Sequence, residues 1–69
     1  MKANKLRAKM VEANFSASEV SKALGMNRAT FYRKMKSGAF SLQEVETMQN
    51  MLSLNTTELI EIFFTREGA

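Results

Sequence analysis

The sequence predicts an all-α fold, a compact domain of five short helices that occupies residues 1–69. The chain has no proline and three glycines, so few of its residues disfavour a helix. A pattern of residues that starts helices recurs at four places, and apolar residues recur between these places at the spacing of one helix face. A chain of 69 residues has room for one domain.

Each helix start is predicted from a polar side chain that accepts a hydrogen bond from a free backbone N–H. Apolar residues on either side reinforce this signal at all four places, and glutamate three residues later reinforces it at three of them. The four candidate caps are Ser16, Asn27, Ser41 and Asn55. Gly25, Gly38 and Asn14 are placed to end helices, because these residue types adopt the left-handed conformation. The predicted helices are 3–13, 17–24, 28–36, 42–52 and 56–65.

The apolar positions of these helices are expected to form the core, because they share one face of each helix. They are Leu6, Met10, Ala13, Val20, Ala23, Leu24, Phe31, Met35, Leu42, Val45, Met48, Leu52, Leu59, Ile62 and Phe63.

Composition excludes several classes of function. Cysteine, histidine and aspartate are absent, so we expect no disulfide, no metal site, no cofactor and no catalysis. No Gly-rich phosphate loop is present, and no small-molecule ligand is evident. The longest purely apolar run is residues 62–64, so we expect no membrane partner, and a cytoplasmic protein is the default.

Charge is divided between the two parts of the chain. Residues 1–40 contain nine basic and two acidic side chains, a net +7, whereas residues 41–69 contain one basic and five acidic ones, a net −4. This division suggests one surface that meets an anion and another that does not. Uneven surface charge without function is the alternative.

Residues 17–36 have the physical pattern of a helix-turn-helix. A helix of about two turns ends at Gly25, a turn of three residues follows, and a second helix starts at Arg28. The small side chain of Ser21 lies where the two helices are expected to cross closely. The apolar residues that close the angle between the helices are Val20, Leu24, Met26 and Phe31.

This segment resembles the helix-turn-helix of the lambda-repressor and Cro-like family of bacterial and phage regulators. The resemblance extends along the chain, because one predicted helix precedes the motif and two follow it. Residues 27–33 are also similar to recognition helices of resolvase-type recombinases, but those domains have three helices. Ser21 stands where the family often has alanine, Lys34 where it often has an apolar residue, and Gly38 comes one residue late. The resemblance implies a five-helix domain that binds double-stranded DNA.

In such a fold the second helix of the motif lies in the major groove. Its outward positions are then the candidates for base contact: Arg28, Ala29, Tyr32 and Arg33. Arginine donates two hydrogen bonds to guanine O6 and N7, so Arg28 and Arg33 are the strongest candidates, with a phosphate contact as the alternative. Ala29 suits a thymine methyl, and Tyr32 suits a methyl or a phosphate.

Phosphate contacts are expected around the motif, where they position the protein without reading sequence. The candidates are Ser16, Ala17, Ser18, Asn27, Thr30, Lys34, Lys36 and Ser37. They lie at the starts of the two helices, where free N–H groups attract anions, and near the end of the second helix.

A homodimer is expected, at least on DNA, because one helix-turn-helix reads only a few base pairs. Ile60 and Phe64 extend the apolar stripe of the last helix beyond its core face and are the candidate dimer interface. By resemblance, the protein is a Cro-like transcriptional repressor of phage or prophage origin. The alternatives are a helical protein-binding module and an excisionase-like accessory protein that bends DNA.

Overall fold

The computed structural model describes residues 1–66, and its regular elements within that range are all helices. They are α1 (Ala3–Glu12), α2 (Ala17–Ala23), α3 (Arg28–Ser37), α4 (Leu42–Leu52) and α5 (Thr56–Phe63). The predicted all-α fold of five helices is therefore confirmed, and each helix end lies within two residues of its predicted position. None of the helices described is long and apolar enough to cross a membrane.

The four predicted caps all begin helices. The side chains of Ser16, Ser41 and Asn55 accept a hydrogen bond from the backbone N–H three residues on, and a glutamate at that position accepts one from the cap's own N–H. The Asn27 side chain accepts from the Thr30 N–H at 2.8 Å. These interactions are local in sequence, which is why the sequence pattern located them.

The helix ends follow the predicted signals as well. Gly25 and Gly38 have φ angles of +73° and +75°, and Asn14 has +63°. A Cβ atom is unfavourable in this left-handed region, which explains glycine at the first two positions. Ser53 also has a positive φ, of +54°, after α4, and its residue type gave no sign of this.

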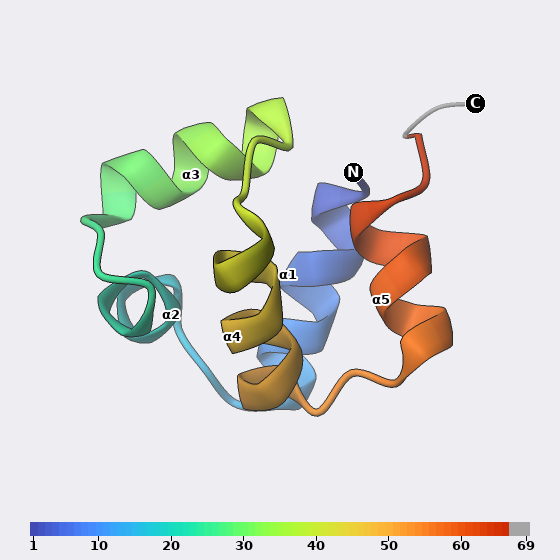
Figure 1. Cartoon of the computed structure of the whole chain (residues 1–69). Coiled ribbons are helices and arrows are strands. Elements are labelled where there is room, and N and C mark those ends of the chain that lie inside the picture. Colours follow the sequence, from blue (N-terminus) through green and yellow to red (C-terminus); the bar gives the residue numbers. More distant parts are fainter. Residues whose placement is uncertain (67–69) are drawn as a thin grey trace.

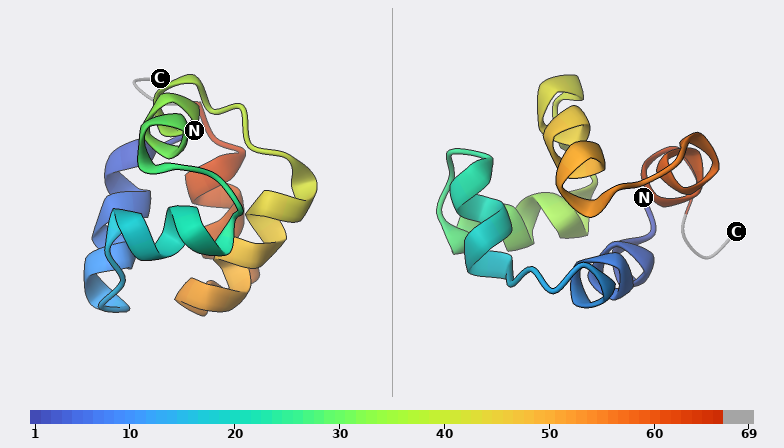
Figure 2. Two further views of the ribbon diagram at one scale, coloured as in Figure 1. Left: turned by 90° about the vertical axis from the view of Figure 1, so that its left-hand side faces the viewer. Right: turned by 90° about the horizontal axis from the view of Figure 1, so that it is seen from below.

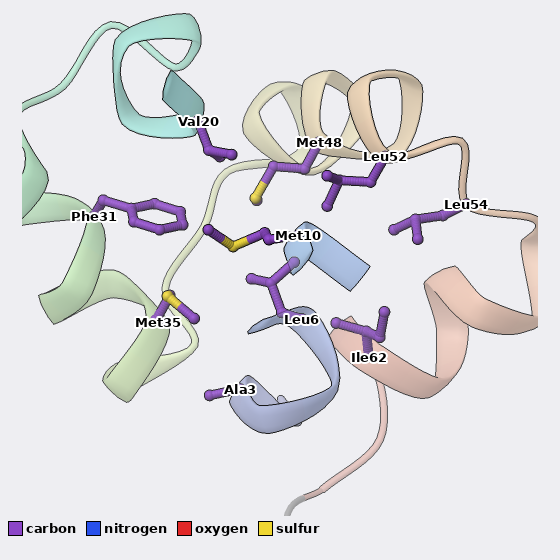
Figure 3. Close-up of a cluster of buried hydrophobic side chains, with 10 residues drawn as sticks. All are labelled: Ala3, Leu6, Met10, Val20, Phe31, Met35, Met48, Leu52, Leu54 and Ile62. Atoms are coloured by element: carbon purple, nitrogen blue, oxygen red, sulfur yellow. The ribbon is translucent and has the colours of Figure 1, made fainter. Parts of the chain in front are cut away.

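One buried apolar cluster joins all five helices, and Figure 3 shows its side chains meeting between them. Its members are Ala3, Leu6, Met10, Val20, Phe31, Met35, Met48, Leu52, Leu54 and Ile62. Phe31 and Met35 of α3 point into this cluster toward Leu6 and Met10 of α1 (Figure 3). Methionine side chains fill the spaces between the helices, as their flexibility allows.

Two predicted core residues are exposed in the structure. Leu42 is the first residue of α4 and is 71% exposed. Helical side chains tilt toward the N-terminus, so the side chain of a first residue leans past the end of its helix. Ala23 is also exposed and borders an open hollow between α2 and α4. Conversely, Ala3 and Leu54 were not predicted to be buried, but both belong to the core.

The arrangement of the helices leaves α3 along one edge of the molecule. In Figure 1 it lies across the top, with α2 below it and α4, α1 and α5 extending downward. The left view of Figure 2 shows α3 end-on, again above the other helices. The right view places α5 on the side away from α2. One long face of α3 is therefore open to a partner.

Candidate nucleic-acid interface

The pair α2 and α3 forms the helix-turn-helix, and the two helices pack directly on each other. The turn is closed by hydrogen bonds from the Gly25 N–H to the Lys22 carbonyl and from the Met26 N–H to the Ser21 carbonyl, both 3.0 Å. Ser21 is buried, and its hydroxyl donates to the Ser18 carbonyl at 3.1 Å. Serine therefore fits this position, because it is small and its polar atom is satisfied within α2.

The rotation of α3 about its axis is set by two anchors. The side chains of Phe31 and Met35 are 0% and 1% exposed, and they lie one helical turn apart. Arg33 lies midway between them in sequence, which places it about 200° around the helix from each. The anchors therefore direct Arg33 straight away from the core.

The predicted base-reading residues are all exposed on α3, as is Lys36. Ala29, Arg33 and Lys36 lie on the side away from the two anchors, whereas Arg28, in the first turn, precedes Met35 by seven residues and so lies near the side of that anchor. Tyr32 is 47% exposed, and its ring lies against that of Phe31, with centroids 6.0 Å apart. Tyr32 is therefore partly packed against a core residue and partly exposed at the surface.

Ser16, Ala17 and Ser18 lie at the start of α2, where a reciprocal cap is already formed. The Ser16 N–H donates to Glu19 Oε1 at 2.9 Å, and the Glu19 N–H donates to Ser16 Oγ at 3.1 Å. The backbone hydrogen bond from Ser16 holds the pKa of Glu19 below its ordinary value. Two amides of this helix start, those of Ala17 and Ser18, take no part in the cap and point where an anion is favoured.

Asn27 and Thr30 lie at the start of α3. Because Asn27 Oδ1 accepts from the Thr30 N–H, the Asn27 oxygen serves as the cap of α3. Its Nδ2 amide group is not used in this bond and can donate to a phosphate oxygen. At the other end of α3, Lys36 and Ser37 are exposed.

Lys34 differs from the other predicted phosphate contacts, because its ammonium is held within the protein. Its Nζ donates to both carboxylate oxygens of Glu44, at 3.1 and 3.0 Å. Both side chains are partly buried, at 28% and 17% exposure. Glu44 also caps α4 by accepting from the Ser41 N–H, and this bond, with Lys34 adding to it, holds the pKa of Glu44 below its ordinary value. The ion pair thus links α3 to the start of α4.

The basic residues of α1 divide into two groups. Lys5 pairs with Glu61 and Lys9 pairs with Glu58, both on α5. The hydrogen bond to Glu58 raises the pKa of Lys9, and the same bond lowers the pKa of Glu58. Part of the charge difference between the two parts of the chain is therefore neutralised inside the fold. Arg7 lies on another side of α1, near α2 and α3.

The sequence pattern identified Glu44 as part of the cap of α4 but not as the partner of Lys34, and it did not identify Arg7. Glu44 lies ten residues from Lys34, and Arg7 lines the same hollow as Tyr32 from another helix. No periodic signal in the sequence relates positions on different helices, so only the packing of the helices reveals these pairs.

An exposed, basic second helix on the open edge of a helix-turn-helix is the arrangement of a DNA-binding domain. Residues 4–37 match the family model described as bacterial regulatory protein, Fis family. The matched stretch begins within α1 and ends with α3, so it contains the whole helix-turn-helix. Searches of curated proteins and of solved structures found no match.

The chain therefore carries a DNA-binding helix-turn-helix of the kind found in transcription regulators. The matched family differs from the lambda-repressor and Cro-like family that the sequence resembles. The match thus supports the class of helix-turn-helix regulators and not the Cro-like family in particular.

Replacing Lys34 with methionine separates a structural role from a phosphate contact. Because Lys34 is held by Glu44, we expect Lys34→Met to reduce the free energy of unfolding by about 1 kcal/mol or less, as for a partly exposed ion pair. We expect no change in the slope of log K against log salt for DNA binding, since each phosphate contact contributes about 0.9 to that slope.

Lys36→Met is the matched control, because Lys36 lies exposed on the same helix. This variant is expected to lower the salt slope by about 0.9. A similar fall for Lys34→Met would show that Lys34 leaves Glu44 and contacts a phosphate in the complex.

Proposed function

We propose that this protein is a sequence-specific regulator that binds double-stranded DNA as a Cro-like repressor of phage or prophage type. It occupies an operator in the bacterial cytoplasm and blocks transcription from it. The observation that carries the proposal is the open face of α3, where two buried anchors direct basic side chains outward. The family match supports the regulator class, and the order of one helix before the motif and two after it supports the Cro-like kind.

Base reading is assigned to the outward residues of α3. Arg28 at the first turn and Arg33 opposite the core are placed to donate pairs of hydrogen bonds to guanine O6 and N7. Ala29 lies between them on the exposed surface and suits a thymine methyl. Tyr32 lies at the flank of this surface, where its ring meets a methyl group or the strand backbone.

Positioning on the strand backbone is assigned to the residues around α3. The start of α2 contributes Ser16 and the amides of Ala17 and Ser18, and the start of α3 contributes Asn27 and Thr30. Lys36 and Ser37 contact phosphates at the end of α3. For Lys34 the ion pair with Glu44 favours a structural role, in which it holds the end of α3 against α4.

Substitution of Arg33 tests base reading most directly. We expect Arg33→Ala to weaken binding to the preferred site by about 1–3 kcal/mol and to relax the preference at one base position. Measurement of binding to a set of duplexes that differ at single positions gives both quantities.

Lys36→Ala serves as the comparison, because the loss of a phosphate contact weakens binding to every sequence about equally. If Arg33→Ala also weakens binding to all sequences equally, then Arg33 contacts the DNA backbone and does not read a base.

A symmetric dimer completes the proposal. The longest dimension of the protein is 29 Å, whereas two half-sites lie about 34–36 Å apart, one helical repeat of DNA. Two copies are therefore needed to occupy both half-sites. Ile60 and Phe64 are 51% and 62% exposed, and they lie four residues apart on one side of the last helix and its end. We assign the contact between two copies to this surface, because both apolar side chains are exposed there and α5 lies on the side of the molecule away from α2 (Figure 2).

Phe64→Ser tests the dimer. Loss of the aromatic contact is expected to shift sedimentation toward the monomer at a matched protein concentration, in the presence of the DNA site. Leu42→Ser is the matched control, because Leu42 is an exposed apolar residue on another helix. If the two variants sediment alike, Ile60 and Phe64 are not the dimer contact, and a different protein partner becomes the better assignment for that surface.

A further inference from the structure

A shallow hollow opens beside the recognition helix, where α1 meets the start of α2. The residues lining it that bear on its role are Arg7, Val11, Phe15, Ser16, Ala17 and Tyr32. They come from three helices and the loop between α1 and α2, so the hollow exists only in the folded protein. It adjoins the open face of α3 through Tyr32.

The apolar part of the hollow is unusually accessible. Val11 is 79% exposed and Tyr32 is 47% exposed, although both are large apolar or aromatic residues. Exposed apolar groups gathered in one place mark a contact site more often than scattered ones do. The exposed rim of this site is continuous with the residues proposed to meet DNA.

Arg7 supplies a positive charge to the same hollow. Its Nη1 donates to Asn4 Oδ1 at 3.0 Å, one helical turn away on α1. A guanidinium has five N–H donors, so this bond orients the group and leaves four donors for another acceptor. The planar pair of donors matches the oxygens of a phosphate.

A neighbouring acidic group, Glu19, restricts where an anion can bind. Its carboxylate accepts a hydrogen bond from the Ser16 N–H and lines an adjoining hollow with Val11 and Phe15. Its charge repels a phosphate from that side of Ser16. Arg7 lies in the hollow on the side with Ala17 and Tyr32 and attracts a phosphate there.

We infer that this hollow holds one sugar–phosphate unit of the DNA strand beside the groove that α3 enters. The phosphate binds Arg7, and the deoxyribose carbons lie on Val11 and Tyr32. The inference rests on the proposed function and adds α1 to the DNA-binding surface, which the helix-turn-helix alone does not include. Arg7 is then a positioning contact that strengthens binding to every sequence.

The test combines the salt dependence of binding with phosphate ethylation interference, on a duplex carrying the site selected from a random library. Arg7→Met is compared with Lys5→Met, which alters the same helix on the side that pairs with α5. We expect Arg7→Met to lower the slope of log K against log salt by about 0.9. Ethylation of one phosphate in each half-site should inhibit DNA binding by the wild-type protein but should not inhibit binding by Arg7→Met. Lys5→Met should keep the wild-type slope and interference pattern.

The outcomes separate this inference from the proposed function. If the wild-type protein selects no site and binds no duplex, the proposed function itself fails. If it binds and Arg7→Met keeps the wild-type salt slope and interference pattern, whatever its affinity, the hollow does not hold a phosphate and the inference is overturned. Thermal unfolding of both variants verifies that a lost contact is not a lost fold.

Discussion

Burial of Phe31 and Met35 is the constraint on which the proposed DNA-binding surface depends. Their side chains are almost completely enclosed among residues of α1, α2 and α4, as Figure 3 shows. Turning α3 about its axis would expose one of them and bury a charged neighbour, and both changes cost free energy. A well-packed core therefore sets which residues of α3 face outward, and it does so without any contact to DNA.

The helices could be predicted closely because their ends depend on local interactions. Ser16, Ser41 and Asn55 each cap a helix through a bond to the residue three positions on, and Gly25 and Gly38 each end a helix through their own backbone angle. Both kinds of signal lie within a few residues of the sequence. The outward face of α3 followed from helical spacing once its inward residues were recognised.

Other features depend on how the helices pack, and the sequence did not reveal them. Leu42 has the spacing of a core residue but stands at the exposed start of α4. Lys34 looks like a free cation beside DNA, yet Glu44 of α4 holds it. Arg7 comes to lie near Tyr32 only because α1 packs beside the helix-turn-helix. In each case the decisive neighbour belongs to a different helix.

The central claim is that α3 reads base sequence in a major groove and that two copies act together. Selection of bound sites from a random duplex library, at low and at physiological salt, tests it most directly. We expect one enriched inverted repeat at both salt concentrations, with half-site centres about 34–36 Å apart, one turn of the double helix. Binding that enriches no motif and disappears at physiological salt would contradict it, because that behaviour reflects charge attraction without base reading.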